Sequence, residues 1–251
     1  MKIHPDDVNV LADQITLARK AAKRTFELAT QAIHHNGSFH IALSGGSTPR
    51  LLFEELTSNP EKYPIDWQHV HIYFGDERSV HPSHQDSNYR MAHETLISKI
   101  QLPNHHAHRI EAELPPDQAA QKYQHVLEKQ LPKSKEGIPL FDLVLLGLGP
   151  DGHIASLFPD TTIIQERAQI VSAVYVEKLQ TWRISITYPT IDQARHIMIL
   201  VSGSNKSQII RELFTDNNNR PIYPVERLNP HGTLEWFLDK AAAQTLDNNN
   251  E

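Results

Sequence analysis

The chain has 251 residues, of which 39% are hydrophobic and 22% are charged, a balance typical of a globular protein with a buried core. Its formal charge of -6 argues against nucleic acid as a partner, and the absence of cysteine excludes disulfides and thiolate metal sites. No apolar run approaches the roughly 20 residues that a membrane helix needs, and the N-terminus MKIHPDDVNV lacks a signal-peptide pattern. We therefore expect a cytoplasmic protein, monomeric or a small homo-oligomer, that binds neither nucleic acid nor membranes.

The first half of the chain alternates between helical and strand patterns. Apolar residues spaced by three or four predict an amphipathic helix over 6–33. A short strand at 39–43 and a helix near 49–57 follow. Next come a strand at 69–74 and a helical stretch over about 87–100. The alternation is typical of units in which a helix connects two parallel strands.

The second half continues the alternation after a polar connection at 101–115. Helices are predicted at 116–130 and 204–214. Between them, strands are predicted at 141–146, 169–176, 182–187 and 195–201. The whole pattern predicts an α/β fold in three layers, Rossmann-like, with a mostly parallel central sheet and helices on both faces. Because no linker interrupts it, we expect a single catalytic domain over 1–246, followed by a polar tail at 247–251.

The segment SGGSTP at 44–49 directly follows a predicted strand. In open α/β sheets, ligands bind at the carboxyl ends of the strands. Gly45 and Gly46 let the backbone approach a ligand closely, and Ser47 or Thr48 is placed to cap the next helix. Free N–H groups at the start of that helix suit a phosphate, although no Walker motif is present. A tight turn without a ligand explains the same residues, so both interpretations stay open.

Two further loops follow predicted strands. GDER at 75–78 crowds charges at a strand end, which is unfavourable unless they pair with one another, as in a surface salt bridge, or with a ligand. DSNY at 86–89 is predicted to begin a helix, with its polar groups as caps. GLGPDGHIASLFP at 147–159 contains a literal G-x-G-x-x-G. Pro159 limits any following helix to about two turns, and Pro150 stiffens the loop, so a dinucleotide site is rejected.

The GLGPDGH loop is instead interpreted as a turn that presents His153 beside Asp151. A histidine titrates near neutral pH and can accept and return a proton within one reaction cycle. Other histidines are interpreted as structural: His69 and His71 share a strand face but lack a third metal ligand, and 105–108 is expected to be an exposed polar loop. No metal site is predicted.

Together, SGGSTP, GDER with SNY shortly after, and GLGPDGHIASLFP resemble the 6-phosphogluconolactonase family in order and spacing. The segment 229–242 is similar to that family's C-terminal part, so the resemblance covers about residues 6–243. The family shares its fold and a DGHIA-like loop with the glucosamine-6-phosphate deaminases and isomerases. Deaminases continue this loop with Phe-Asn-Glu-Pro, whereas this chain continues with SLFP at 156–159, which favours the lactonase.

The resemblance implies hydrolysis of 6-phospho-D-glucono-1,5-lactone to 6-phosphogluconate in the oxidative pentose phosphate pathway, without a cofactor. It implies that His153 is the general base that activates water and then, as an imidazolium, protonates the leaving oxygen. Asp151 is expected to orient His153 or to bind sugar hydroxyls. The oxyanion donors are expected to be backbone N–H groups of the glycine loops or Arg78.

The resemblance also implies cations that bind the phosphate, namely Arg183 in WRISIT and Lys206 in SGSNK. Family members often have prolines just before the arginine, where this chain has LQTW. The complete set of predicted substrate-binding residues is Ser44, Gly45, Gly46, Ser47, Thr48, Asp76, Arg183 and Lys206. Two other functions are considered, a sugar-phosphate isomerase or deaminase of the same fold and a non-catalytic sugar-phosphate-binding protein.

Overall fold

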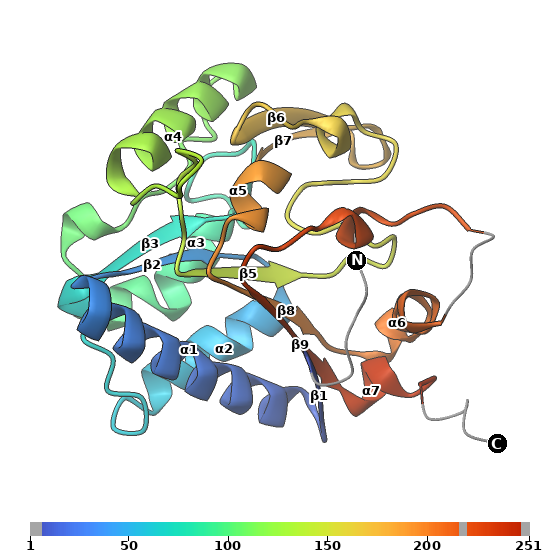
Figure 1. Cartoon of the computed structure of the whole chain (residues 1–251), viewed down its shortest axis with the longest axis horizontal. Coiled ribbons are helices and arrows are strands. Elements are labelled where there is room, and N and C mark those ends of the chain that lie inside the picture. Colours follow the sequence, from blue (N-terminus) through green and yellow to red (C-terminus); the bar gives the residue numbers. More distant parts are fainter. Residues whose placement is uncertain (1–6, 216–219, 247–251) are drawn as a thin grey trace.

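A six-stranded sheet runs through the centre of the molecule in the order β1-β9-β8-β5-β2-β3, and all of its strand pairs are parallel (Figure 1). Its strands are β1 (Val8–Leu11), β2 (Phe39–Leu43), β3 (Val70–Phe74), β5 (Leu143–Gly147), β8 (His196–Val201) and β9 (Thr233–Asp239). The computed structural model describes residues 7–215 and 220–246, so the tail predicted at 247–251 lies outside the described residues. The inner strands are apolar because both of their faces are covered.

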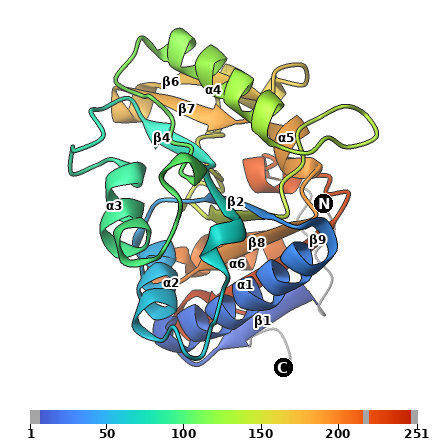
Figure 2. The ribbon, with the colours of Figure 1, turned by 90° about the vertical axis from the view of Figure 1, so that its left-hand side faces the viewer.

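Helices and a second, smaller sheet cover the two faces of the central sheet. Figure 2 shows α1 and α2 on one side, with the small sheet and α4 on the other. The helices are α1 (Gln14–Asn36), α2 (Ser47–Ser58), α3 (Asn88–Thr95), α4 (Pro116–Gln130), α5 (Tyr188–Asp192), α6 (Ser207–Phe214) and α7 (Lys240–Ala243). None of the helices in the described ranges combines the length and hydropathy that a bilayer span requires.

The small sheet has the strand order β4-β7-β6, and its strands pair antiparallel. It contains β4 (Asp76–Arg78), β6 (Val171–Val176) and β7 (Thr181–Ile186). The sequence predicts strands for the last two but places no strand at 76–78, where it predicts a loop. A connection of a few residues between β6 and β7 is too short for the crossover that parallel pairing needs, so the two strands form a hairpin.

The predicted helix over 6–33 is wrong at its start. Residues Val8–Leu11 form the edge strand β1 beside β9, and α1 begins at Gln14. Asp13 ends the strand region and caps the helix, because its side chain accepts a hydrogen bond from the Thr16 amide at 2.7 Å. Val8 and Leu11 also fit a helical spacing, and only pairing with β9 distinguishes the two conformations.

The histidine predictions require two corrections. His69 lies in the 3-10 turn Trp67–His69 before β3, with its Nδ1 2.8 Å from Asp66, so it forms no pair with His71. In the segment 105–108 only His105 is exposed, because His106 and His108 are half-buried against the strands. Within residues 7–215 and 220–246, no three His, Asp or Glu side chains are placed to hold a metal ion.

Histidines from β2, from β3 and from the loop after α3 stack on one another. The ring of His71 stacks on those of His40 and His106, with centroids 4.8 and 3.8 Å apart, and its Nδ1 lies 3.3 Å from Nε2 of His108. Tyr73 stacks on His108 with centroids 4.5 Å apart. We call His40, His71, His106 and His108 the histidine stack. Its members come together only in the folded chain, since they lie on two strands and a loop.

The histidine stack is expected to make the fold sensitive to acid. Burial lowers the pKa of His40 to about 3 and the pKa values of His71 and His108 to about 4, and the neighbouring histidines act in the same direction. In the unfolded chain these groups titrate near 6.5. Between about pH 6.5 and 4 the unfolded chain therefore binds more protons, and the free energy of unfolding falls as the pH drops through this window.

Denaturant unfolding of the wild type at pH 7 and pH 5 measures this loss of stability. His108→Gln removes one depressed titration, so its stability is expected to fall less between the two pH values. His34→Gln, at an exposed position of α1, is the matched control and should keep the full wild-type decrease. An equal decrease in all three proteins would contradict the assignment to the histidine stack.

Candidate active site

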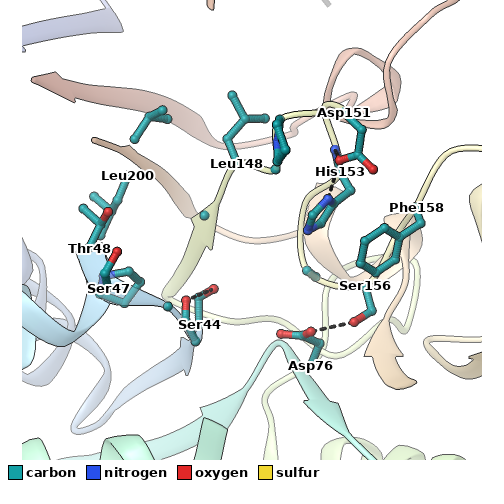
Figure 3. A pocket seen from close by; sticks show the side chains of 18 of the residues that line it. Ser44, Ser47, Thr48, Asp76, Leu148, Asp151, His153, Ser156, Phe158 and Leu200 are labelled. Carbon is teal, nitrogen blue, oxygen red and sulfur yellow. Dashed lines mark hydrogen bonds and ion pairs between the residues drawn. The ribbon is translucent and has the colours of Figure 1, made fainter. Parts of the chain in front are cut away.

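A cavity of about 700 Å³ opens at the carboxyl ends of β2, β5 and β8 (Figure 3). Strand order reverses at β2 and β5, because the chain runs from β2 outward to β3 and then returns to β5 on the other side. Such a switch point is where ligands bind in open α/β sheets. All eleven site residues predicted from the sequence line the cavity, namely Ser44, Gly45, Gly46, Ser47, Thr48, Asp76, Arg78, Asp151, His153, Arg183 and Lys206.

The SGGSTP loop connects β2 to α2 and forms one wall of the cavity. Gly46 adopts φ 105, a left-handed value that favours glycine, and α2 begins at Ser47. The predicted cap is wrong, because among the described residues no side chain caps the start of α2. Thr48 Oγ1 instead lies 2.8 Å from Ser202 Oγ, which joins the loops after β2 and β8. The N-cap residue Gly46 has no side chain that could accept from the first N–H groups of α2.

His153 is held in one orientation by Asp151 at the edge of its ring and by Phe158 on one face of it (Figure 3). Its Nδ1 lies 2.5 Å from Asp151 Oδ1, and its ring stacks on Phe158 with centroids 4.0 Å apart. With Nδ1–H donating to the carboxylate, the lone pair of the neutral ring is on Nε2. The side chain is 25% exposed, and it lines the cavity. The imidazole is therefore neither sealed in the interior nor directed away from the site.

Gly149 leaves the space that the His153 ring occupies. A Cβ at Gly149 would lie 1.9 Å from His153 Nδ1 and 2.6 Å from Asp151 Oδ1. Gly149→Ala is therefore expected to displace the ring and to lower turnover about 10²-fold, because misplacement of a reacting group by about 1 Å has an effect of this size. Gly147→Ala, at the end of β5 directly before this loop, is the control, since its Cβ would meet only Ser44 Oγ, at 4.0 Å. Equal turnover of the two variants would contradict the packing argument.

The environment of His153 keeps its ring neutral at physiological pH. Burial lowers the pKa of His153 to about 4, and the charges of Lys206, Arg183 and Arg78 act in the same direction. Asp76 acts in the opposite direction. A neutral imidazole with its lone pair in the cavity is able to accept a proton from a bound molecule.

Asp76 is the first residue of β4 and its carboxylate is buried. Ser156 Oγ donates to it at 2.6 Å, as Figure 3 shows, and Asn88 Nδ2 donates at 3.2 Å. These bonds connect the small sheet to the loop that carries His153 and to the start of α3. The Asn88 side chain also fills the space beside Gly45, where a Cβ would lie 1.8 Å from its Oδ1.

Glu77 forms no surface salt bridge, which was one interpretation of the GDER segment. The residue is 3% exposed, and its carboxylate accepts hydrogen bonds from the Ser87 hydroxyl and from three backbone N–H groups, those of Arg78, Asn88 and Tyr89. Burial raises the pKa of Glu77, while the N–H donors oppose this rise. The prediction that 86–89 begins a helix is confirmed, since Ser87 caps α3. The acidic residue thus anchors the start of α3 beside the cavity.

Two arginines lie opposite each other on neighbouring strands of the small sheet. Arg78 of β4 and Arg183 of β7 are direct partners in the antiparallel pair, a position where like charges destabilise a sheet. The Nε atoms of both are buried and have no hydrogen-bond partner in the described part of the chain. Burial lowers the pKa of Arg183 and that of Lys206. A bound anion would relieve the repulsion and occupy the free donors.

Several lining residues were not singled out from the sequence. Ser156 and Phe158 belong to the GLGPDGHIASLFP motif, and Asn88 belongs to SNY. The motifs themselves therefore predict that these residues lie close to the site. Lys178 lies in the connection between β6 and β7, and no sequence pattern marks it. Only the folding of the small sheet over the central sheet brings Lys178 to the cavity.

Comparison with known protein families finds a match over residues 12–236, to the family described as glucosamine-6-phosphate isomerases/6-phosphogluconolactonase. A protein of Haemophilus influenzae named 6-phosphogluconolactonase is 39% identical over 212 residues, covering 84% of this chain and 89% of that protein. One of Nostoc sp. with the same name is 35% identical over 240 residues, covering 95% and 98%.

Solved structures of similar proteins also superpose on this chain. The 6-phosphogluconolactonase from Trypanosoma cruzi superposes with a TM-score of 0.85 at 30% identity, covering 98% of each chain. A monomeric glucosamine-6-phosphate deaminase superposes with a TM-score of 0.76 at 19% identity, covering 95% of this chain and 99% of the other. At that identity the second likeness concerns the fold alone.

Proposed function

The chain belongs to the family of glucosamine-6-phosphate isomerases and 6-phosphogluconolactonases, and from this premise we propose that it hydrolyses 6-phospho-D-glucono-1,5-lactone to 6-phosphogluconate. This reaction is a step of the oxidative pentose phosphate pathway. The observation that carries the proposal is a neutral histidine with a free Nε2 in a cavity that is also lined by four cationic side chains, Arg78, Lys178, Arg183 and Lys206. Such a site suits an ester whose distant end is a phosphate.

In the proposed mechanism His153 Nε2 removes a proton from a water molecule as that water attacks C1 of the lactone. The resulting tetrahedral intermediate carries an oxyanion on the former carbonyl oxygen. Its collapse breaks the bond between C1 and the ring oxygen, and the imidazolium of His153 returns the proton to that oxygen. The product is an open-chain carboxylic acid, which ionises. Proton transfer of this kind typically contributes about 10²–10⁴-fold in rate.

The phosphate of the substrate is proposed to bind between the small sheet and the start of α2. Arg183 and Lys206 supply charge-assisted hydrogen bonds, and the residues at 44–48 supply N–H groups and hydroxyls. The sequence offers Arg78 as one of two candidate oxyanion donors. Because it lies directly opposite Arg183, we propose that it binds the phosphate instead, with the backbone N–H groups of the glycine loops as the oxyanion donors. Contacts at the phosphate position C1 next to the water and His153. The binding energy of these remote contacts therefore lowers the barrier of the reaction.

The lactonase is distinguished from an isomerase or deaminase by a direct assay. Acid release from freshly prepared 6-phosphogluconolactone is followed with and without the protein, and glucosamine 6-phosphate is tested in parallel for ammonia release. Acceleration of the first reaction alone is expected. The chain has serine, leucine and phenylalanine where the deaminase loop carries Phe-Asn-Glu, and Ser156 and Phe158 contact Asp76 and His153 respectively. Calorimetric binding without hydrolysis would support a non-catalytic binding protein instead.

The same proposal places the protein in the cytoplasm, as a monomer or small homo-oligomer that acts on a free sugar phosphate. Relatives in Oryza sativa and Arabidopsis thaliana are named as chloroplastic, so the compartment of this chain is checked by fractionation. Size-exclusion chromatography with light scattering measures its oligomeric state.

A further inference from the structure

Lys178 reaches the cavity from the small sheet. It lies in the 3-10 turn Glu177–Leu179, which joins β6 to β7, and its side chain is 49% exposed. Its Nζ contacts Asp151 Oδ2 and lies 4.7 Å above the ring of Phe158. An isolated surface ion pair contributes little. This lysine, however, contacts two groups that both support His153.

The four side chains form a closed ring of contacts. Asp151 accepts from His153 Nδ1 with Oδ1 and from Lys178 with Oδ2, so both of its oxygens are occupied. Phe158 stacks on the His153 ring and also carries the ammonium of Lys178 above its own ring. A cation above the face of an aromatic ring is attracted by the electrons of that ring. Each support of the histidine is therefore held in turn by the same ammonium group.

We propose that Lys178 is a positioning residue of the hydrolysis, which fixes Asp151 against His153 and offsets the negative charge that would otherwise favour the imidazolium. The proposal deepens the lactonase function and rests on it for its kinetic readout. Lys178 touches Asp151 and Phe158, which hold the base, so it acts through them. Without its ammonium, Asp151 would face His153 as an uncompensated carboxylate.

The other charges around His153 stay in place when Lys178 is removed. They are Asp76 and Arg78 of β4, Arg183 of β7 and Lys206 in the turn before α6. Asp76 favours the imidazolium and the three cations oppose it. Loss of Lys178 removes the cation that offsets the charge of Asp151, while Asp151 keeps its hydrogen bond to His153 Nδ1. The uncompensated carboxylate favours proton uptake by His153, so the acid limb of the activity profile should move to higher pH.

The kinetic test compares Lys178→Met, Lys178→Arg and the wild type. For Lys178→Met we expect the acid limb of kcat/KM to move up by about one pH unit, since a single charge a few ångströms from a half-buried group has an effect of this order. We also expect kcat, measured at pH values where His153 is neutral, to fall about tenfold, because a less firmly held Asp151 lets the His153 ring leave its reactive position. Lys178→Arg restores the charge and should return the limb to its wild-type position. Spontaneous hydrolysis is subtracted at each pH.

Lys122→Met is the matched control. Lys122 also pairs with a carboxylate, that of Glu111 at 2.7 Å, but on the exposed face of α4. Its removal should leave the pH profile unchanged. A lysine that only stabilised the fold would lower the amount of active protein without moving the limb. An unmoved limb in Lys178→Met, or a limb that Lys178→Arg fails to restore, would overturn the proposal.

A second measurement is independent of turnover. The His153 imidazole is titrated by NMR in the wild type and in Lys178→Met, with its signal assigned by its loss in His153→Asn. The midpoint should rise by about one pH unit in Lys178→Met. If the wild type fails to hydrolyse the lactone, the proposed function is wrong, while this titration still decides the role of Lys178. Equal midpoints in the two proteins would rule that role out.

Discussion

Replacement of His153 by alanine is expected to lower kcat about 10²–10⁴-fold, the usual contribution of a positioned general base. The structure gives the physical reason. The imidazole is neutral, because burial and three cations lower its pKa to about 4, and its Nδ1 is occupied by Asp151. Its remaining nitrogen, Nε2, is the group that we propose takes the proton of water. Loss of the ring is expected to leave substrate binding intact and to remove this proton acceptor.

The fold should survive the change. His153 lies in a loop with a quarter of its side chain exposed, and its removal breaks no strand pair. Thermal unfolding should therefore give a Tm close to that of the wild type. His125→Ala, on the exposed surface of α4, is the control and should keep full activity. If purified His153→Ala hydrolysed the lactone nearly as fast as the wild type, after subtraction of the spontaneous rate, the general-base role would be wrong.

Replacement of Arg183 by alanine is expected to raise KM and to lower kcat/KM about 10–100-fold, since hydrogen bonds to charged groups contribute about 1.5–3 kcal/mol. Arg183 has a buried Nε without a partner in the described residues and lies opposite Arg78. Removal of one cation relieves their repulsion. The Tm should therefore stay constant or rise, which separates lost substrate binding from lost folding.

The measurement is the dependence of rate on lactone concentration at pH 7.5, where His153 is neutral in both proteins. Competition by 6-phosphogluconate and by inorganic phosphate gives a second readout, and both should inhibit Arg183→Ala less than the wild type. Arg211→Ala, at an exposed position of α6, is the control. Unchanged KM and unchanged inhibition would place the phosphate elsewhere in the cavity.

Local pattern was sufficient for the elements whose residues are determined by their own neighbours. The strand β2 was predicted at 39–43 and the helix α4 at 116–130, and the structure gives both with the same bounds. The motifs were equally informative, because loops after parallel strands meet at one edge of the sheet wherever those strands lie in it. The set of residues around the cavity could thus be named before their distances were known.

Long-range pairing decided the rest. Val8–Leu11 follows a helical spacing and becomes a strand only because β9, at the other end of the chain, offers it an edge. The hairpin of β6 and β7 carries Arg183 and Lys178 to the site, and β4 places Arg78 opposite Arg183. The spacing of residues along the sequence does not predict that Arg78 and Arg183 lie opposite each other.

The sequence by itself therefore determined the α/β class, the loops that line the cavity and the histidine that we propose as the base, because each depends on residues close together in the chain. Tertiary structure alone decided how acidic that histidine is, which cations lie around it and which lysine contacts its supports. Those properties depend on burial and on distances between charges from separate elements, and both arise only when the small sheet packs over the central one.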